Sequence, residues 1–178
     1  MSRKPSNELR YSIADEMLYG TIAAETFSMK AFSGGGRGST AGIQRNDLAH
    51  WNTQKKAPAR FDAANRGGPL PVGLYLAIYV DGHKRFGRCA FLQQTLLSLI
   101  HADPTSPVGI AVTERDDFFI HGDGPRGSDG CIVPAQRTAL RALLNAIGKA
   151  TGPVPLWVHS EGVRSDRLDA APDVRHLA

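Results

Sequence analysis

The chain has 178 residues, of which 42% are hydrophobic and 21% are charged, with a formal net charge of +4 and a pI near 9.3. This length fits one domain that buries a core of its own, and the composition is that of an ordinary globular protein. No apolar run approaches the about 18 residues of a membrane span. The basic residues are scattered among acids without interleaved aromatics, which argues against nucleic acid as a partner.

The first part of the chain is expected to form short strands and long loops. Residues 11–13 and 17–20 look like a hairpin that turns at residues 14–16, and Thr26 to Phe32 alternates as a half-buried strand does. The glycine-rich stretch that follows can form only a loop. The polar segment 40–66 is predicted to be a long loop, of a length that is often functional.

Further strands are expected after this loop, at residues 74–80, 108–113, 117–120 and 154–158. Residues 67–73 form a proline-containing turn before the first of them, and Asp81-Gly82 predicts the next chain reversal. Residues 89–100 fit either a helical face or one face of a strand, so their structure stays open.

The clearest helix covers residues 134–148. Its apolar face consists of Leu140, Leu143, Leu144 and Ile147. Pro134 suits the first turn and Gly148 suits the C-terminal cap. Residues 161–178 form a polar tail of mixed charge. Many strands and one main helix predict an α+β fold dominated by β-structure.

Residues 118–133 carry the strongest chemical signal, with the sequence Phe-Phe-Ile-His-Gly-Asp-Gly-Pro-Arg-Gly-Ser-Asp-Gly-Cys-Ile-Val. A thiol nucleophile in acyl transfer needs a base, a stabilised thiolate and a site for the oxyanion. His121 at a strand end can take the thiol proton, and the helix after Cys131 is expected to favour the thiolate. Gly130 lets backbone N–H groups approach a substrate carbonyl closely. The segment therefore indicates a cysteine enzyme.

Each of these residues also has a simpler interpretation. Cys131 alone fits a small buried hydrophobe, and His121 fits a satisfied core histidine. Ser128 either holds the loop or touches substrate, and Asp129 either shapes the loop, orients a base or binds an incoming amine. Cys89 is expected to be structural.

A metal site is not expected, although His121, Asp123 and Cys131 could each supply a ligand. The interval of two residues between His121 and Asp123, and the lack of an obvious fourth ligand, argue against a metal site. No cofactor is expected either. Arg37, in the glycine-rich loop, could meet a substrate carboxylate.

His121-Gly122 followed by Ser128-Asp129-Gly130-Cys131 resembles the signature of YkuD-type L,D-transpeptidases, in which His-Gly precedes Ser-His-Gly-Cys. This sequence departs from the pattern in three ways. Asp129 replaces the histidine, no Arg or Asn follows the cysteine, and the interval between the motifs is shorter. These departures are similar to those of type VI secretion effectors with an L,D-transpeptidase fold.

Two other segments match that narrower group. Residues 31–38, Ala-Phe-Ser-Gly-Gly-Gly-Arg-Gly, resemble its early Tyr-Ser-Gly-x-Gly element. Residues 68–75, Gly-Pro-Leu-Pro-Val-Gly-Leu-Tyr, resemble Gly-Pro-Ile-Pro-x-Gly-x-Tyr. The resemblance spans about residues 9–158 of a single domain over residues 1–178. It implies a mixed β-sheet or β-sandwich with one main helix after the catalytic cysteine.

The resemblance also implies an activity and a set of site residues. Cys131 would attack the third residue of a peptidoglycan stem tetrapeptide, with His121 as base, and D-alanine would leave. Water then gives L,D-carboxypeptidase activity, and a free D-amino acid gives exchange. The oxyanion and substrate would meet the residues around the cysteine and histidine, namely Gly122, Ser128, Asp129 and Gly130. Ser33 and Arg37 are candidate substrate contacts.

The implied partners are those of a delivered toxin: peptidoglycan stem peptides, free D-amino acids, a periplasmic immunity protein and a secretion-system spike or chaperone. Residues 1–8 contain no apolar region, so we expect synthesis in the cytoplasm without a signal peptide. The resemblance implies secretion and action in the periplasm of target bacteria. Two alternatives remain. The missing signal argues against a housekeeping wall transpeptidase, and the intact His121 and Cys131 argue against an inactive wall-binding module.

Overall fold

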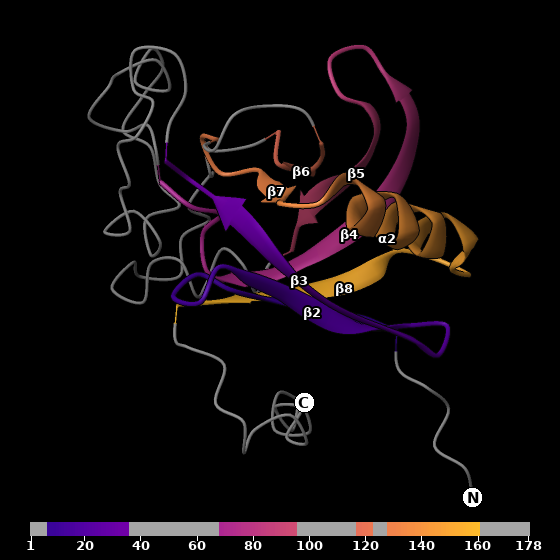
Figure 1. Cartoon of the computed structure of the whole chain (residues 1–178), viewed down its shortest axis with the longest axis horizontal. Helices are drawn as coiled ribbons and strands as arrows, with labels where there is room; N and C mark the ends of the chain where they lie inside the picture. Colours follow the sequence, from indigo (N-terminus) through magenta and orange to yellow (C-terminus); the bar gives the residue numbers. More distant parts are fainter. Residues whose placement is uncertain (1–6, 36–67, 96–116, 123–127, 161–178) are drawn as a thin grey trace, which may run out of the picture.

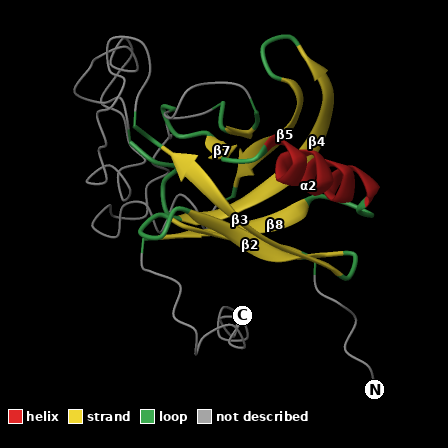
Figure 2. Ribbon diagram, in the orientation of Figure 1, coloured by secondary structure: helices red, strands yellow, loops and turns green. Residues whose placement is uncertain are grey.

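The computed structural model describes residues 7–35, 68–95, 117–122 and 128–160. These residues form one mixed sheet that closes on itself, with one helix packed outside it (Figures 1 and 2). The strands are β1 (Glu8–Ser12), β2 (Met17–Ile22), β3 (Glu25–Ser33), β4 (Gly73–His83), β5 (Gly87–Gln94), β6 (Phe119–Ile120), β7 (Ile132–Pro134) and β8 (Val154–His159). The helix is α2 (Arg137–Lys149).

The order around the closed barrel is β1-β2-β3-β7-β6-β5-β4-β8. Most neighbouring strands are antiparallel, but β1 with β8 and β6 with β7 are parallel. Each strand has a neighbour on both sides in this order, but the closure is short, because β7 pairs with β3 at three positions, β6 with β5 at two and β6 with β7 at one. The predicted mixed sheet is confirmed. It forms one closed layer and not the two stacked sheets of a sandwich.

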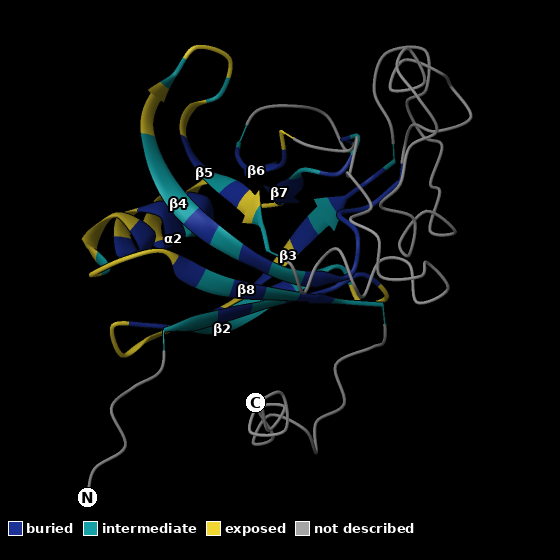
Figure 3. Cartoon of the chain, turned by 180° about the vertical axis from the view of Figure 1, so that it is seen from behind, coloured by how far each residue is buried: buried dark blue, intermediate teal, exposed yellow. Residues whose placement is uncertain are grey.

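The hydrophobic core is formed by every second residue of the strands, because alternate side chains of a strand point to the same face of the sheet. In β3 the side chains of Phe27, Met29 and Ala31 point inward, while their neighbours Ser28 and Lys30 are exposed. Alternate residues of the other strands complete the interior, and Figure 3 shows buried and less buried residues alternating along strands such as β4. This alternation is what burying one face of each strand requires.

Helix α2 buries the apolar face that the sequence predicts, with Leu143 fully buried. The helix begins at Arg137 instead of residue 134, because Pro134 is the last residue of β7. It also continues past Gly148, which is not the cap. A Cβ at Gly148 would lie 3.3 Å from the Tyr79 ring, so glycine lets the helix approach β4 closely. No helix in these described ranges is long and apolar enough to cross a membrane.

The first predicted hairpin is confirmed, since Ser12 pairs with Met17 across a turn at residues 13–16. The predicted reversal at Asp81-Gly82 is wrong. Strand β4 continues through both residues to His83, and the chain turns at residues 84–86. Gly82, with φ +78°, instead lies where the register shifts between Val80 and His83, which is a β-bulge.

The remaining strand predictions have mixed outcomes. Strands at residues 74–80 and 154–158 are confirmed, and the open segment 89–100 is strand as far as Gln94. In the predicted strand 117–120 only the last two residues are strand. The predictions for residues 40–66, 108–113 and 161–178 lie outside the described residues.

Candidate active site

The parallel pair β6–β7 positions the two residues that the sequence predicts to be catalytic. Ile120 pairs with Ile132, and the His121 N–H donates to the Ile132 carbonyl at 3.1 Å. His121 follows β6 directly and Cys131 precedes β7 directly. Both isoleucines are fully buried, so strand alternation directs His121 and Cys131 to the opposite side of this pair. The two residues therefore lie on one face of adjacent strands, with His121 at the C-terminal end of β6 and Cys131 at the N-terminal end of β7, two positions apart along the parallel pair.

The ring of His121 is held in one orientation. It is only 6% exposed, and its Nδ1 lies 2.8 Å from the carbonyl oxygen of Gly122. A carbonyl oxygen can only accept a hydrogen bond, so Nδ1 carries the hydrogen and Nε2 is the basic nitrogen of the neutral ring. A Cβ at Gly122 would lie 2.9 Å from Cδ2 of Leu140, so the glycine also lets α2 pack against this segment.

Cys131 is half-buried, and its Sγ lies 3.8 Å from the carbonyl oxygen of Asp117, within reach of a weak S–H···O hydrogen bond. The expectation that the following helix stabilises the thiolate is wrong. Strand β7 separates Cys131 from Arg137, at which α2 begins, and an extended chain rises about 3.3 Å per residue. The helix dipole acts only within about one turn of the terminus, so α2 does not supply the stabilisation of a Cys131 thiolate that the sequence predicted.

Two serine hydroxyls hold the backbone of the cysteine loop. Ser128 Oγ donates to the Cys131 carbonyl at 2.6 Å and accepts the N–H groups of Gly34 and Gly130 at 3.2 and 3.3 Å. Ser33 Oγ donates to the Gly130 carbonyl at 3.0 Å. Both serines are buried. Of the two interpretations of Ser128, the hydrogen bonds favour the one in which it holds the loop.

The three segments that carry the sequence resemblance meet at Ser33. Its hydroxyl bonds to Gly130 of the cysteine motif and accepts the Leu70 N–H at 2.8 Å, from the Gly-Pro-Leu-Pro segment. Gly35 forms a β-bridge with Ser128, and Ser33 pairs with Ile132 across β3 and β7. Segments far apart in the sequence therefore build one wall of the site.

The other predicted site residues have different placements. The Gly130 N–H donates to Ser128, so in this conformation it is engaged inside the loop and does not point at a substrate oxyanion. Its φ of +120° explains why glycine occupies this position. Asp129 is half-buried between Ser128 and Gly130. Asp123 and Arg37 lie outside the described residues. Within the ranges that the structure describes, no group of three His, Cys, Asp or Glu side chains could hold a metal ion.

Two neighbours of the site were not predicted from the sequence. The ring of Phe86, from the β4–β5 turn, stacks on His121 with centroids 4.0 Å apart and planes 15° apart. Asp117 has φ +57°, a left-handed conformation that aspartate tolerates better than most residues, and it presents its carbonyl to Cys131. A lone aromatic residue in a turn and a backbone carbonyl leave no recognisable pattern in one sequence.

Comparison with known proteins identifies the fold of the chain but not its family. No protein-family model and no curated protein match the sequence. Among solved structures, the helical cell shape determining protein Pgp2 from Campylobacter jejuni matches at 14% identity and a TM-score of 0.50, over 87% of this chain and 48% of that one. A point mutant of Pgp2 matches at 13% identity and a TM-score of 0.52, over 92% of this chain and 50% of that one.

An L,D-transpeptidase from Xylanimonas cellulosilytica matches with a TM-score of 0.47 and 14% identity, over 89% of this chain and 63% of that one. The chain thus spans about half the length of the Pgp2 chains and under two thirds of this third one. The predicted β-dominated α+β fold is confirmed by the strands and the helix of the described residues, and the Pgp2 structures share this fold.

Proposed function

We propose that the chain is a cysteine acyltransferase that acts on the stem tetrapeptides of bacterial peptidoglycan. The observation that carries the proposal is the position of His121 directly after β6 and of Cys131 directly before β7, on one face of this parallel pair. The bond from His121 Nδ1 to the Gly122 carbonyl leaves Nε2 as the basic nitrogen, on the strand next to a half-buried thiol. Thiol-dependent acyl transfer needs a base and a nucleophile of this kind.

In the proposed reaction, Nε2 of His121 takes the thiol proton and the Cys131 thiolate attacks the carbonyl carbon of the third stem residue. The resulting oxyanion collapses, the peptide C–N bond breaks, and the imidazolium gives its proton to the departing amine of D-alanine. A thioester between Cys131 and the shortened peptide remains. Water that His121 deprotonates hydrolyses this thioester, or the amine of a free D-amino acid takes the place of water and gives exchange.

Two observations support peptidoglycan as the substrate. The motifs around His121, Cys131 and Ser33 resemble those of YkuD-type L,D-transpeptidases, and these segments meet in the fold. The Pgp2 structures, which share the fold, belong to a protein named for determining helical cell shape, a property that a bacterial wall sets.

The biological role in the proposal is that of an antibacterial toxin. A type VI secretion system would deliver it through a spike or chaperone into the periplasm of a target cell. There it would trim stem peptides, and an immunity protein would protect the producer. The support is the narrower resemblance of residues 31–38, 68–75 and 118–133 to effectors of that system.

The enzymatic part is tested with purified protein and disaccharide tetrapeptides, with and without free D-methionine. We expect released D-alanine, a tripeptide product, an exchanged product when D-methionine is present, and a thioester adduct on Cys131 by intact-protein mass spectrometry. Binding to wall sacculi without any product from the wild-type chain would overturn the enzyme proposal in favour of a wall-binding module.

The toxin role is tested by expressing the chain in bacteria with and without an added export signal. We expect growth arrest only with the signal, and none when Cys131→Ala is exported. Equal toxicity without export would point to a cytoplasmic target and overturn the role. Harmless export of a chain that turns over tetrapeptides in vitro would also overturn it, and would favour a housekeeping wall enzyme.

A further inference from the structure

The β4–β5 hairpin reaches the catalytic histidine through a bulge. Val80 pairs with Cys89, but the next pair is His83 with Gly87, so β4 has one residue more than β5 between these pairs. Gly82 takes up the irregularity with φ +78°. A bulge of this kind turns the strand and re-aims the side chains beyond it, and bulges are common beside active sites. Figure 1 shows this hairpin extending beyond the barrel on the side where β6 and β7 lie.

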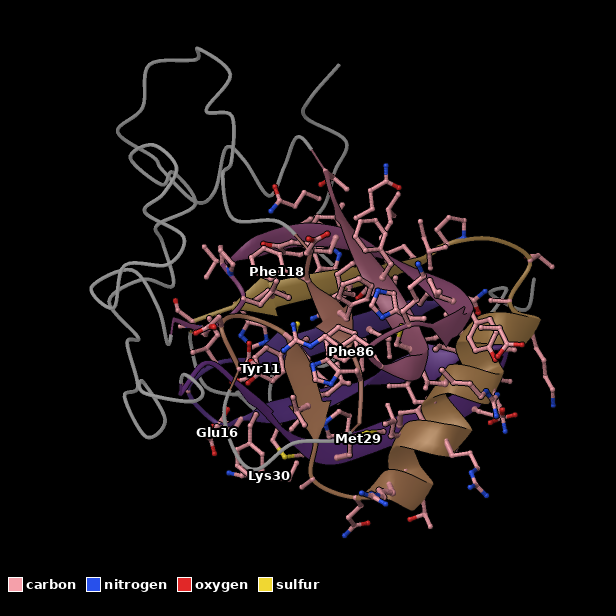
Figure 4. The ribbon with its side chains drawn as sticks, turned by 90° about the horizontal axis from the view of Figure 1, so that it is seen from above. Tyr11, Glu16, Met29, Lys30, Phe86 and Phe118 are labelled. Carbon is pink, nitrogen blue, oxygen red and sulfur yellow. The ribbon has the colours of Figure 1, made fainter. Side chains whose placement is uncertain are left out.

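Phe86, in the turn after the bulge, lies directly on the imidazole of His121. The two ring centroids are 4.0 Å apart and the planes differ by 15°, a parallel stack. Figure 4 shows Phe86 beside the segment that contains β6 and β7. Together with the Nδ1 bond to the Gly122 carbonyl, the stack fixes both the tilt and the rotation of the imidazole ring.

The turn that carries Phe86 is itself held by His83. Nδ1 of His83 lies 3.3 Å from the backbone nitrogens of Arg85 and Phe86, which donate to it. The His83 ring stacks on the Phe86 ring, with centroids 5.0 Å apart and planes 14° apart. It also contacts the ring of Phe119 in β6, with centroids 4.8 Å apart. Phe86 therefore lies between two imidazoles, anchored by one and covering the other.

We propose that Phe86 is a positioning residue for His121, an inference that rests on the proposed function for its catalytic meaning. The ring of Phe86 holds the plane of the imidazole in place while the proton moves between Cys131 and Nε2. A side chain of similar size without a planar ring would occupy the same space but would not stack on the imidazole.

The test compares Phe86→Leu with Phe86→Tyr, which keeps the ring, and with Phe91→Leu. Phe91 is a half-buried ring of the same cluster, 5.5 Å from Phe119, so its loss serves as the matched control. Three quantities are measured: the proton shifts of the His121 ring by NMR, the alkylation rate of Cys131 by iodoacetamide at neutral pH, and kcat and KM on the tetrapeptide.

We expect Phe86→Leu to remove the ring-current shift of His121 and to slow alkylation and kcat by about tenfold, with little change in KM. Phe86→Tyr should restore all three, and Phe91→Leu should leave them near wild-type values. Wild-type alkylation and unchanged His121 shifts in a folded Phe86→Leu variant would overturn the inference. If these two quantities respond as expected but the wild type does not turn over tetrapeptides, the positioning role stands and the proposed function fails.

Discussion

The hydroxyl of Ser33, at the end of β3, donates a hydrogen bond of 3.0 Å to the carbonyl oxygen of Gly130, the residue before the proposed nucleophile. The same hydroxyl accepts the N–H of Leu70 at 2.8 Å. One buried side chain thus connects the first strands, the segment leading into β4 and the cysteine loop. Because all three groups are buried, losing this hydroxyl would leave backbone groups without their partner.

Ser33→Ala should therefore lower both stability and activity. We expect a loss of about 1–3 kcal/mol in the free energy of unfolding, from the unsatisfied Leu70 N–H and Gly130 carbonyl. We also expect a lower kcat, because the cysteine loop loses its tie to β3. The matched control is Ser28→Ala on the same strand, where the side chain is exposed and the change should stay within about 0.5 kcal/mol. Equal denaturation curves for the two variants would contradict this role of Ser33.

Cys131→Ala should abolish the release of D-alanine and leave the fold intact. Cys131→Ser should be nearly inactive as well, because a hydroxyl ionises far less readily than a thiol. The control is Cys89→Ala. Burial in β5 raises the pKa of the Cys89 thiol and keeps it protonated, so this variant should retain turnover. Turnover near the wild-type rate in Cys131→Ala, measured by chromatography of the products, would remove the thiol from the mechanism.

His121→Ala should lower the rate by about 10²-fold or more at neutral pH, the usual scale for a lost general base. The loss should shrink at alkaline pH, where the thiol ionises without help. A pH–rate profile of tetrapeptide turnover measures both effects. His159→Ala is the control, since His159 at the end of β8 bonds to Tyr19 at 2.9 Å and is not part of the β6–β7 pair. A profile for His121→Ala that runs parallel to the wild type would exclude its role as the base.

Alkaline pH should destabilise the fold through Tyr11. Burial, and next the charge of Glu16, raise the pKa of the Tyr11 phenol well above its ordinary value of 10.0. The folded chain therefore keeps the phenol protonated where the unfolded chain ionises it. The stability contribution is fully present below pH 10 and is lost as the pH rises above that value.

The free energy of unfolding in urea, measured at pH 8 and pH 11, tests this sign. The wild type should lose stability between the two, and Tyr11→Phe should lose less, because phenylalanine cannot ionise. A smaller decline will remain, since burial also raises the pKa of Tyr19. The same pH dependence in Tyr11→Phe and wild type would show that Tyr11 does not contribute.

Much of the local structure, and the motif that contains His121 and Cys131, could be predicted from the sequence alone. Alternation along residues 26–32 and the apolar face around Leu143 are local patterns, because burying one side of a strand or helix imposes a period on the sequence. His121 and Cys131 were also predicted to be site residues from the sequence, since a histidine, a glycine-rich loop and a cysteine lie within one short segment.

The way in which this motif is arranged in space depends on contacts between segments that are distant in the sequence. The three residues of β7 are too few to show a period, so Pro134 suggested a helix start where a strand pairs with β3 and β6. The Asp81-Gly82 pair fits a turn or a bulge equally well, and the closing of the sheet selected the bulge. The contacts of Ser33 with Gly130 and of Phe86 with His121 join separate strands. Such contacts depend on the register of the closed sheet, which no local pattern contains.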